Sequence, residues 1–169
     1  HLTDKPFNRY YLHSVDGFVY MSEQVHSELR AYSDAPALFS PHPLFENFGE
    51  RVERSEACVR LGLDPANRYV LFFGLIRDYK GLDLLLDAWA QLRRAGRTEG
   101  RRLIVAGEFY TAREPYLNRI ADNGLQDEVL LHDRFIPDDD VKYYFSAADF
   151  VVQPYKTATQ SGVTQIAYQ

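Results

Sequence analysis

From Tyr69 onward, short apolar segments alternate with segments of helical periodicity, and this alternation constrains the fold more than any other feature of the sequence. The expected strands are 69–73, 103–106, 128–131 and 149–153. The expected helices are 82–95, 113–122, 139–147 and 163–168. In the first helix the large apolar residues have the spacing of one helical face, at Leu82, Leu85, Leu86, Trp89 and Leu92. Such alternation is typical of a parallel sheet with helices on both faces, so the predicted fold class is α/β.

The first part of the chain lacks this regularity. It predicts a short strand at 17–21 and a helix at 22–32, for which Ser22 is a good N-cap. Three prolines within 33–43 remove backbone donors and disfavour helix, so we expect a linker or hinge there. A further helix is expected at 50–62, where a glycine ends it.

The composition is that of a globular protein with a substantial core, because 46% of the 169 residues are apolar. The net charge of −5 gives no global positive field, so we expect no nucleic-acid partner, and any anion site must be local. The single cysteine, Cys58, excludes an intrachain disulfide and fits a reducing compartment, so we expect a cytoplasmic protein. Because the chain lacks an initiator Met and stops within a helical pattern, we expect a fragment of a longer protein.

The loop between strand 69–73 and the helix that follows carries two cations. Gly74 ends the strand, and Arg77 and Lys80 come before Gly81. Ligands of α/β sheets bind at the carboxyl ends of the strands, and a helix N-terminus adds free N–H groups and partial positive charge. A lysine is electrostatically unfavourable there unless an anion is present. The position therefore favours phosphate binding over an ordinary exposed lysine.

Two further loops are expected at the same edge of the sheet. Residues 157–162, Thr-Ala-Thr-Gln-Ser-Gly, offer hydroxyls that either bind a ligand or only cap the next helix. Glu108 follows strand 103–106, where it either accepts hydroxyls of a sugar or stays a solvated acid. Two loops on one edge would hold the two ends of one phosphorylated ligand.

No metal site is expected, since the histidines are scattered without ligand spacing. The acids at 138–140 follow Pro137, and a helix start favours acids without any metal. No run of 18 apolar residues exists, so no membrane span is expected. Arginines cluster around the end of helix 82–95, at Arg93, Arg94, Arg97, Arg101 and Arg102. They either complement the helix dipole or make a peripheral contact with an anionic membrane.

Four segments resemble the nucleotide-sugar-dependent glycosyltransferases of family 4, which have the GT-B architecture. They are Phe72-Phe-Gly-Leu-Ile-Arg-Asp-Tyr-Lys-Gly81, Leu103-Ile-Val-Ala-Gly-Glu-Phe109, Phe135-Ile-Pro137 with Ala147-Ala-Asp149, and Pro154-Tyr-Lys-Thr-Ala-Thr-Gln-Ser-Gly162. The resemblance implies that residues 1–33 are the remnant of an N-terminal acceptor domain and that 34–50 are an interdomain linker. Residues 51–169 would be a Rossmann-like donor-binding domain that is incomplete at its C-terminus.

The resemblance also implies roles for individual residues. Lys80 matches the family lysine that holds the donor diphosphate, whereas the family arginine stands where this chain has Leu75, so Arg77 would replace it. The backbone of Phe135 and Ile136 would lie beside the nucleobase. At the positions of the two family glutamates this chain has Thr159 and Ala167. We expect the ribose and sugar contacts of those glutamates to be made instead by Thr159, Gln160, Ser161 and Gly162.

By this resemblance the parent protein is a hexosyltransferase. It would take a sugar from a nucleoside diphosphate with retention, without metal or cofactor, and pass it to a saccharide or lipid-linked acceptor. Transfer would require the N-terminal domain, so we expect this chain alone to be inactive. Apolar residues within 1–33 would make the fragment prone to form oligomers. The missing glutamates keep an alternative open, a non-catalytic module that binds a nucleotide or phosphosugar.

Overall fold

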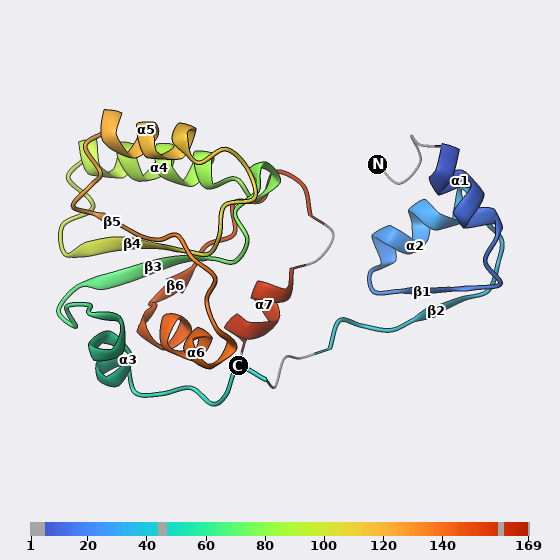
Figure 1. Ribbon diagram of the computed structural model, residues 1–169, viewed down its shortest axis with the longest axis horizontal. Coiled ribbons are helices and arrows are strands. Elements are labelled where there is room, and N and C mark those ends of the chain that lie inside the picture. The colour runs from blue at the N-terminus through green and yellow to red at the C-terminus, as the bar shows by residue number, and fades with distance from the viewer. Residues whose placement is uncertain (1–5, 44–46, 159–160, 169) are drawn as a thin grey trace. The chain divides into compact units, whose positions relative to one another are not determined.

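The structure, a computed structural model, describes residues 6–43, 47–158 and 161–168 (Figure 1). The chain divides into two compact units. The first comprises residues 1–44 with 159–162, and the second comprises residues 45–158 with 163–169. Each unit is described by itself.

The first unit contains two short helices and two short strands. They are α1 (Pro6–His13), β1 (Phe18–Tyr20), α2 (Glu23–Arg30) and β2 (Ala37–Phe39). The strands pair in parallel, with Phe18 opposite Ala37. The hydroxyl of Ser22 accepts a hydrogen bond from the N–H of Val25 at 3.3 Å, which confirms the predicted N-cap of α2. Helix α1 was not predicted from the sequence.

Strand β2 lies within the proline-rich segment 33–43, where we predicted only a linker. The prolines flank the strand and leave its own donors intact. The carbonyl of Pro36 accepts from the N–H of Phe18 at 2.8 Å, and the N–H of Ser40 donates to the carbonyl of Tyr20 at 2.9 Å. The segment therefore contains a short strand that the sequence analysis did not predict, and its role as a linker or hinge stays a prediction.

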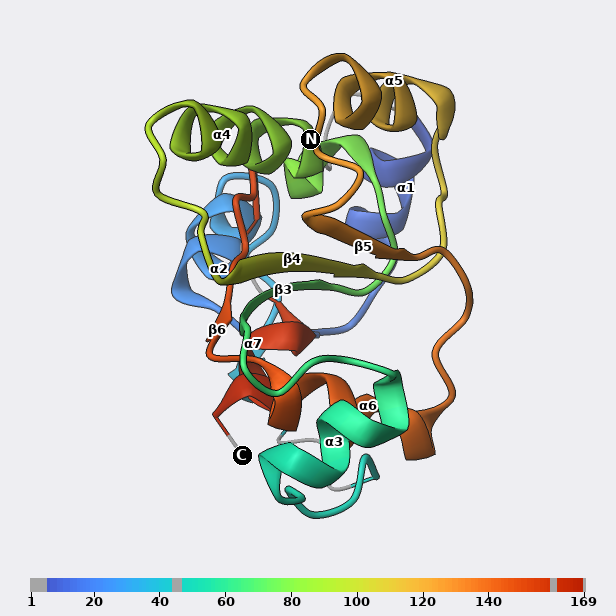
Figure 2. The same cartoon turned by 90° about the vertical axis from the view of Figure 1, so that its left-hand side faces the viewer.

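The second unit is a four-stranded parallel sheet in the order β5-β4-β3-β6. Its strands are β3 (Arg68–Phe73), β4 (Arg101–Ala106), β5 (Val129–His132) and β6 (Phe150–Val151). Its helices are α3 (Arg54–Leu61), η1 (Asp78–Lys80), α4 (Leu82–Arg94), α5 (Glu114–Asp122), α6 (Asp138–Ala147) and most of α7 (Gly162–Ala167). Helices α4 and α5 cover one face of the sheet and α3 and α6 the other, as Figures 1 and 2 show. The predicted α/β class is confirmed.

The core consists of two apolar layers, one on each face of the sheet. Along β4 the side chains alternate between them, because successive strand residues point to opposite faces. Leu103 and Val105 pack with α4 and α5, whereas Ile104 and Ala106 pack with α3 and α6. Full burial of each large aliphatic side chain contributes about 1.5–3 kcal/mol.

Two details of the second unit differ from the prediction. Leu92 does not join the core stripe of α4 and is 37% exposed. Helix α3 begins at Arg54 rather than near Glu50, because the N–H of Val52 donates to the hydroxyl of Ser146 at 3.1 Å. That bond holds the segment before α3 against α6.

Cys58 is fully buried in the core, where burial raises the pKa of its thiol.

The ends of β3 and β4 approach so closely that only glycine fits between them. At Gly107, with φ at 138°, an added Cβ would lie 2.2 Å from the carbonyl oxygen of Gly74. At Gly62, with φ at 67°, an added Cβ would meet nothing within 4 Å. Both glycines have a positive φ, but Gly62 is in the αL region with open space around it, whereas Gly107 is outside that region and crowded.

We expect Gly107→Ala to lower the free energy of unfolding well beyond Gly62→Ala. The control variant carries only the backbone strain of a positive φ, about 1–2 kcal/mol. Gly107→Ala adds a clash with backbone, for which overpacking costs about 1–3 kcal/mol more. Urea unfolding of both variants measures the difference. Equal losses would mean that the close approach of β3 and β4 is not a constraint.

Candidate functional site

The loops after β3 and β4 run side by side beyond the ends of the strands. The N–H of Ile76 donates to the carbonyl of Glu108 at 2.8 Å, and the N–H of Tyr110 donates to the carbonyl of Ile76 at 2.9 Å. These bonds continue the parallel pairing at the carboxyl edge, where α/β sheets bind ligands. The segment with Arg77 and Lys80 therefore lies next to the segment with Glu108.

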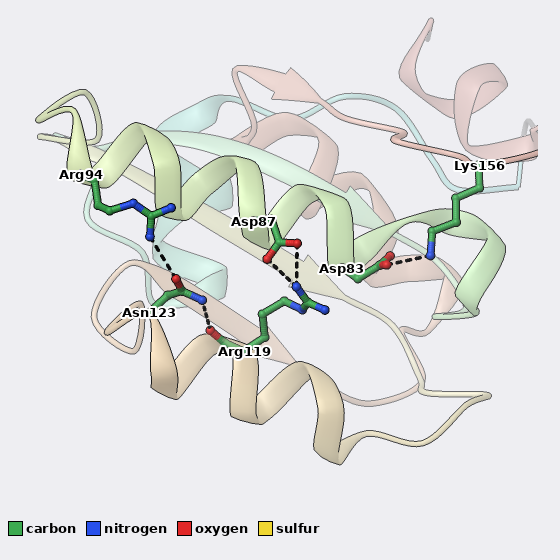
Figure 3. A network of polar contacts seen from close by, with 6 residues as sticks. All are labelled: Asp83, Asp87, Arg94, Arg119, Asn123 and Lys156. Carbon is green, nitrogen blue, oxygen red and sulfur yellow. Dashed lines mark hydrogen bonds and ion pairs between the residues drawn. The ribbon is translucent and has the colours of Figure 1, made fainter.

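The segment after β6 joins the other side of the same edge. An added Cβ at Gly81 would lie 2.0 Å from the carbonyl oxygen of Pro154, so the two backbones touch. The N–H of Lys156 donates to the carbonyl of Tyr79 at 2.8 Å, and Nζ of Lys156 lies 2.7 Å from Oδ2 of Asp83 (Figure 3). The segment that leads into the predicted loop 157–162 therefore lies against the Lys80 loop.

Lys80 occupies the last position of η1, directly before α4, and is only 9% exposed. Among the described residues its ammonium has neither a hydrogen-bond acceptor nor a carboxylate partner. Burial, with a smaller contribution from the charge of Arg77, lowers the pKa of Lys80. An isolated, partly dehydrated cation at a helix N-terminus is well suited to bind an anion.

Arg77 adds a second cation to this loop. It precedes η1, its side chain is exposed, and its guanidinium lies 5.3 Å from the ring centroid of Tyr110. Its charge is one cause of the lowered pKa of Lys80, so the two cations share a common field. An anion bound near both would relieve their mutual repulsion.

The two acids that are nearest to Lys80 in the sequence, Asp78 and Asp83, have other partners. Asp78 accepts from the hydroxyl of Thr111 at 2.9 Å and from that of Tyr116 at 3.2 Å. Burial and the bond to Asp78 raise the pKa of Tyr116 to about 12, so this phenol stays a donor at neutral pH. Burial alone would raise the pKa of Asp83, but the bond to Lys156 and its charge bring that pKa below its ordinary value. Neither carboxylate neutralises Lys80.

Helix α4, which begins at this site, is held along its length by polar side chains. Besides the Asp83–Lys156 pair, both oxygens of Asp87 accept from Arg119 of α5 at 2.5 and 2.6 Å (Figure 3). Nearer its C-terminal end, Arg94 donates to Oδ1 of Asn123 at 3.2 Å. These contacts fix the helix whose N-terminus faces the ligand edge.

The other predicted site residues differ in their exposure to solvent. Glu108 is half-buried beside the Lys80 loop. Phe135 has an exposed side chain, and Ile136 is buried in the core. Within the described part of the chain, no backbone–backbone hydrogen bond involves either residue.

The predicted loop 159–162 is placed only in part. Thr159 and Gln160 lie outside the described residues. Ser161 is half-buried, and Gly162 is the first residue of α7. The predicted contact of this loop with a ligand stays a prediction.

Two aromatic residues at this edge were not predicted to be part of the site. The ring of Tyr155 lies below the ammonium of Lys80, with Nζ 5.8 Å from its centroid, and the ring of Tyr110 faces Arg77. The signal that was available is their place in loops that follow expected strands, Tyr110 directly after one quoted segment and Tyr155 within another. His132, at the end of β5, bonds through Nδ1 with the Tyr144 hydroxyl at 2.8 Å. Burial, and then the charge of Arg134, lower the pKa of His132.

Two further searches covered only the described ranges. They contain no group of three or more His, Cys, Asp or Glu residues arranged to hold a metal ion. None of their helices has the length and apolar character needed to cross a membrane.

The chain belongs to the family described as Glycosyl transferases group 1, whose sequence model matches residues 67–168. Among curated proteins it is 32% identical, over 136 residues, to the lipopolysaccharide core biosynthesis mannosyltransferase LpsB of Rhizobium meliloti. The match takes in 73% of this chain but only 35% of that relative.

Solved structures support the same fold. Sucrose-phosphate synthase of Thermosynechococcus elongatus matches with a TM-score of 0.74 at 22% identity, over 92% of this chain and 39% of that protein. Anabaena Alr3699/HepE, in complex with UDP and glucose, matches with a TM-score of 0.68 at 17% identity, over 96% and 46%. At these identities the likeness shows the fold alone, which is the GT-B-like α/β arrangement.

We expect Lys80→Ala to weaken the binding of a nucleoside diphosphate far more than that of the nucleoside. Loss of one charge-assisted hydrogen bond costs about 1.5–3 kcal/mol, or about 10- to 150-fold in affinity. Calorimetric titration with UDP and uridine, and with the GDP and ADP pairs, measures this. Lys142→Ala, on α6, is the matched control and should leave both affinities unchanged. Equal losses for nucleoside and diphosphate in Lys80→Ala would show an effect on folding rather than on phosphate.

The lowered pKa of Lys80 predicts a pH dependence of the same binding. An anion prefers the protonated amine, so diphosphate affinity should fall as pH rises through a pKa below the ordinary 10.5. Terminal phosphates are fully ionised well above their second pKa of about 6, so the diphosphate group does not titrate in that window. Uracil and guanine do lose a ring proton at alkaline pH, so ADP is the probe for this experiment. Titrations at stepped pH should show the fall, and Lys80→Ala should remove it. A profile that Lys80→Ala leaves unchanged would assign the titration to another group.

Proposed function

We propose that this chain binds the nucleoside diphosphate sugar of a glycosyltransferase and that its parent protein transfers the sugar to an acceptor. One observation carries the proposal: Lys80 is a buried ammonium without a carboxylate partner among the described residues, at the N-terminus of α4 and the carboxyl edge of the sheet. Membership in the group 1 glycosyltransferases supports this use of the site. The UDP in the complex of Alr3699/HepE supports a nucleotide donor.

The chemistry of this site follows from where charge develops. In transfer, the bond between the anomeric carbon and the diphosphate oxygen breaks, and its electron pair stays on the leaving diphosphate. A bond from the acceptor hydroxyl oxygen to that carbon replaces it, and the hydroxyl proton passes to a base that we do not assign to this chain. Lys80 and Arg77 would stabilise the growing negative charge as preorganised cations. We propose that no metal or cofactor takes part and that the configuration is retained, as in family 4.

Further residues would bind the rest of the donor. The backbone groups of Phe135 and Ile136, which have no backbone partner among the described residues, would contact the nucleobase, and Glu108, beside the Lys80 loop, would accept sugar hydroxyls. We propose that loop 159–162 replaces the carboxylates lost at Thr159 and Ala167. Gly74 lets the Lys80 side chain lie close to the end of β3, since an added Cβ would be 3.0 Å from Nζ.

The loss of those carboxylates favours one alternative, a module that binds a nucleotide sugar without turning it over. The chain covers only 35% of LpsB and 39% of sucrose-phosphate synthase, so the acceptor and the transfer step are proposals about a longer protein. We propose a cytoplasmic hexosyltransferase whose acceptor, a saccharide or a lipid-linked sugar, is bound by a further domain. Donor turnover by such a protein separates the enzyme from the module.

A donor panel tests the proposed binding directly. The chain should be stabilised by one family of nucleoside diphosphate sugars, and a ligand at 100 times its dissociation constant adds about 2.7 kcal/mol of stability. Thermal unfolding with UDP-, GDP- and ADP-sugars measures this, with the matching nucleosides as controls. The isolated chain should bind the donor but not transfer its sugar to an acceptor. No shift with any donor at millimolar concentration would contradict the proposal.

A further inference from the structure

The segment Pro154–Lys156 lies across the loop that carries Lys80 and is fixed there at three points. Its backbone touches Gly81, its Lys156 N–H donates to the carbonyl of Tyr79, and the Lys156 ammonium pairs with Asp83. These contacts join the end of β6 to both η1 and the first turn of α4. Tyr155 stands in the middle of this fixed segment.

The ring of Tyr155 is oriented by Tyr79 and faces Lys80. The Tyr79 and Tyr155 rings meet edge to face, with centroids 6.0 Å apart and planes at 70°. Nζ of Lys80 lies 5.8 Å from the Tyr155 centroid, within the range of a cation–π contact. The ammonium is also close to Gly74, where an added Cβ would lie 3.0 Å away. The end of a long, flexible side chain thus contacts both a backbone and a ring.

We propose that Tyr155 is a positioning residue, which holds the ammonium of Lys80 in place for the diphosphate of the donor. The inference rests on the proposed function of Lys80. A carboxylate would also hold a lysine, but it would neutralise the charge and compete with phosphate. An aromatic face attracts the cation through its quadrupole and leaves the N–H donors and the full positive charge available to an anion. Lys80 thereby meets the ligand already ordered, which raises affinity by lowering the entropy lost on binding.

The inference can be tested in the ligand-free protein. The chain has four lysines, at positions 5, 80, 142 and 156, so labelled lysine gives few signals to assign by Lys→Arg variants. The side-chain signal of Lys80 should carry a ring-current shift that Tyr155→Leu and Tyr155→Met remove and Tyr155→Phe retains. Nζ of Lys142 lies 5.3 Å from the ring centroid of Tyr143, so its signal is an internal control that should not change.

Binding then tests the role. Tyr155→Leu should weaken binding of the nucleoside diphosphate by about 2- to 30-fold and leave nucleoside binding unchanged. Tyr155→Phe, which keeps the aromatic face, should lose less affinity than Tyr155→Leu. In the Lys80→Ala background Tyr155→Leu should cause no further loss, because the residue would act only through Lys80. UDP, GDP and ADP, each with its nucleoside, serve as probes, and the unchanged Lys142 signal shows that a variant is folded.

The outcomes separate this inference from the proposed function. If Lys80→Ala weakens diphosphate binding but Tyr155→Leu and Tyr155→Met do not, the positioning role is wrong and the phosphate role stands. If Tyr155→Leu and Lys80→Ala have additive effects, Tyr155 acts on the ligand by another route, and the inference is overturned. If Lys80→Ala has no effect on diphosphate binding, the phosphate role itself fails. A ring-current shift of Lys80 in the unmodified chain would then show only that Tyr155 packs against this lysine.

Discussion

The close approach of backbones at two glycines is the constraint on which the candidate site depends. Gly107 lets the end of β4 touch the end of β3, and Gly81 lets the segment after β6 touch the start of α4. A side chain at either position would meet a backbone oxygen and not a flexible group. Three loops from three strands are therefore brought to one edge of the sheet, and the polar groups that they carry become neighbours.

Two of the acids at this edge are paired with groups other than Lys80. Asp78 accepts from two hydroxyls, and Asp83 is paired with Lys156. Lys80 and Arg77 contact aromatic rings, which attract cations without neutralising them. Lys80 lost part of its hydration on burial, and a bound phosphate would replace the lost hydrogen bonds and charge interactions. This gain favours the binding of an anion here. The lowered pKa of Lys80 has the same cause, because burial disfavours the charged form of the amine.

The sequence predicted the parts of this molecule that local pattern determines. The alternation after Tyr69 indicated a parallel sheet with two covered faces, and the glycine-bounded loop indicated where cations would stand. The sequence did not predict contacts between segments that are distant along the chain. Whether Tyr155 reaches Lys80 depends on β6 lying beside β3, and periodicity does not give strand order. Strand β2 was missed because prolines flank it, and the start of α3 was misplaced because a bond to Ser146 from another helix decides it.

The central claim is that the ammonium of Lys80 binds the diphosphate of a sugar nucleotide. A crystal structure of the chain with a bound nucleoside diphosphate tests it most directly. The account predicts a phosphate oxygen within about 2.7–2.9 Å of Nζ of Lys80, the length of a charge-assisted hydrogen bond. A diphosphate bound elsewhere, for example among the arginines between α4 and β4, with Lys80 still facing only Tyr155, would contradict it.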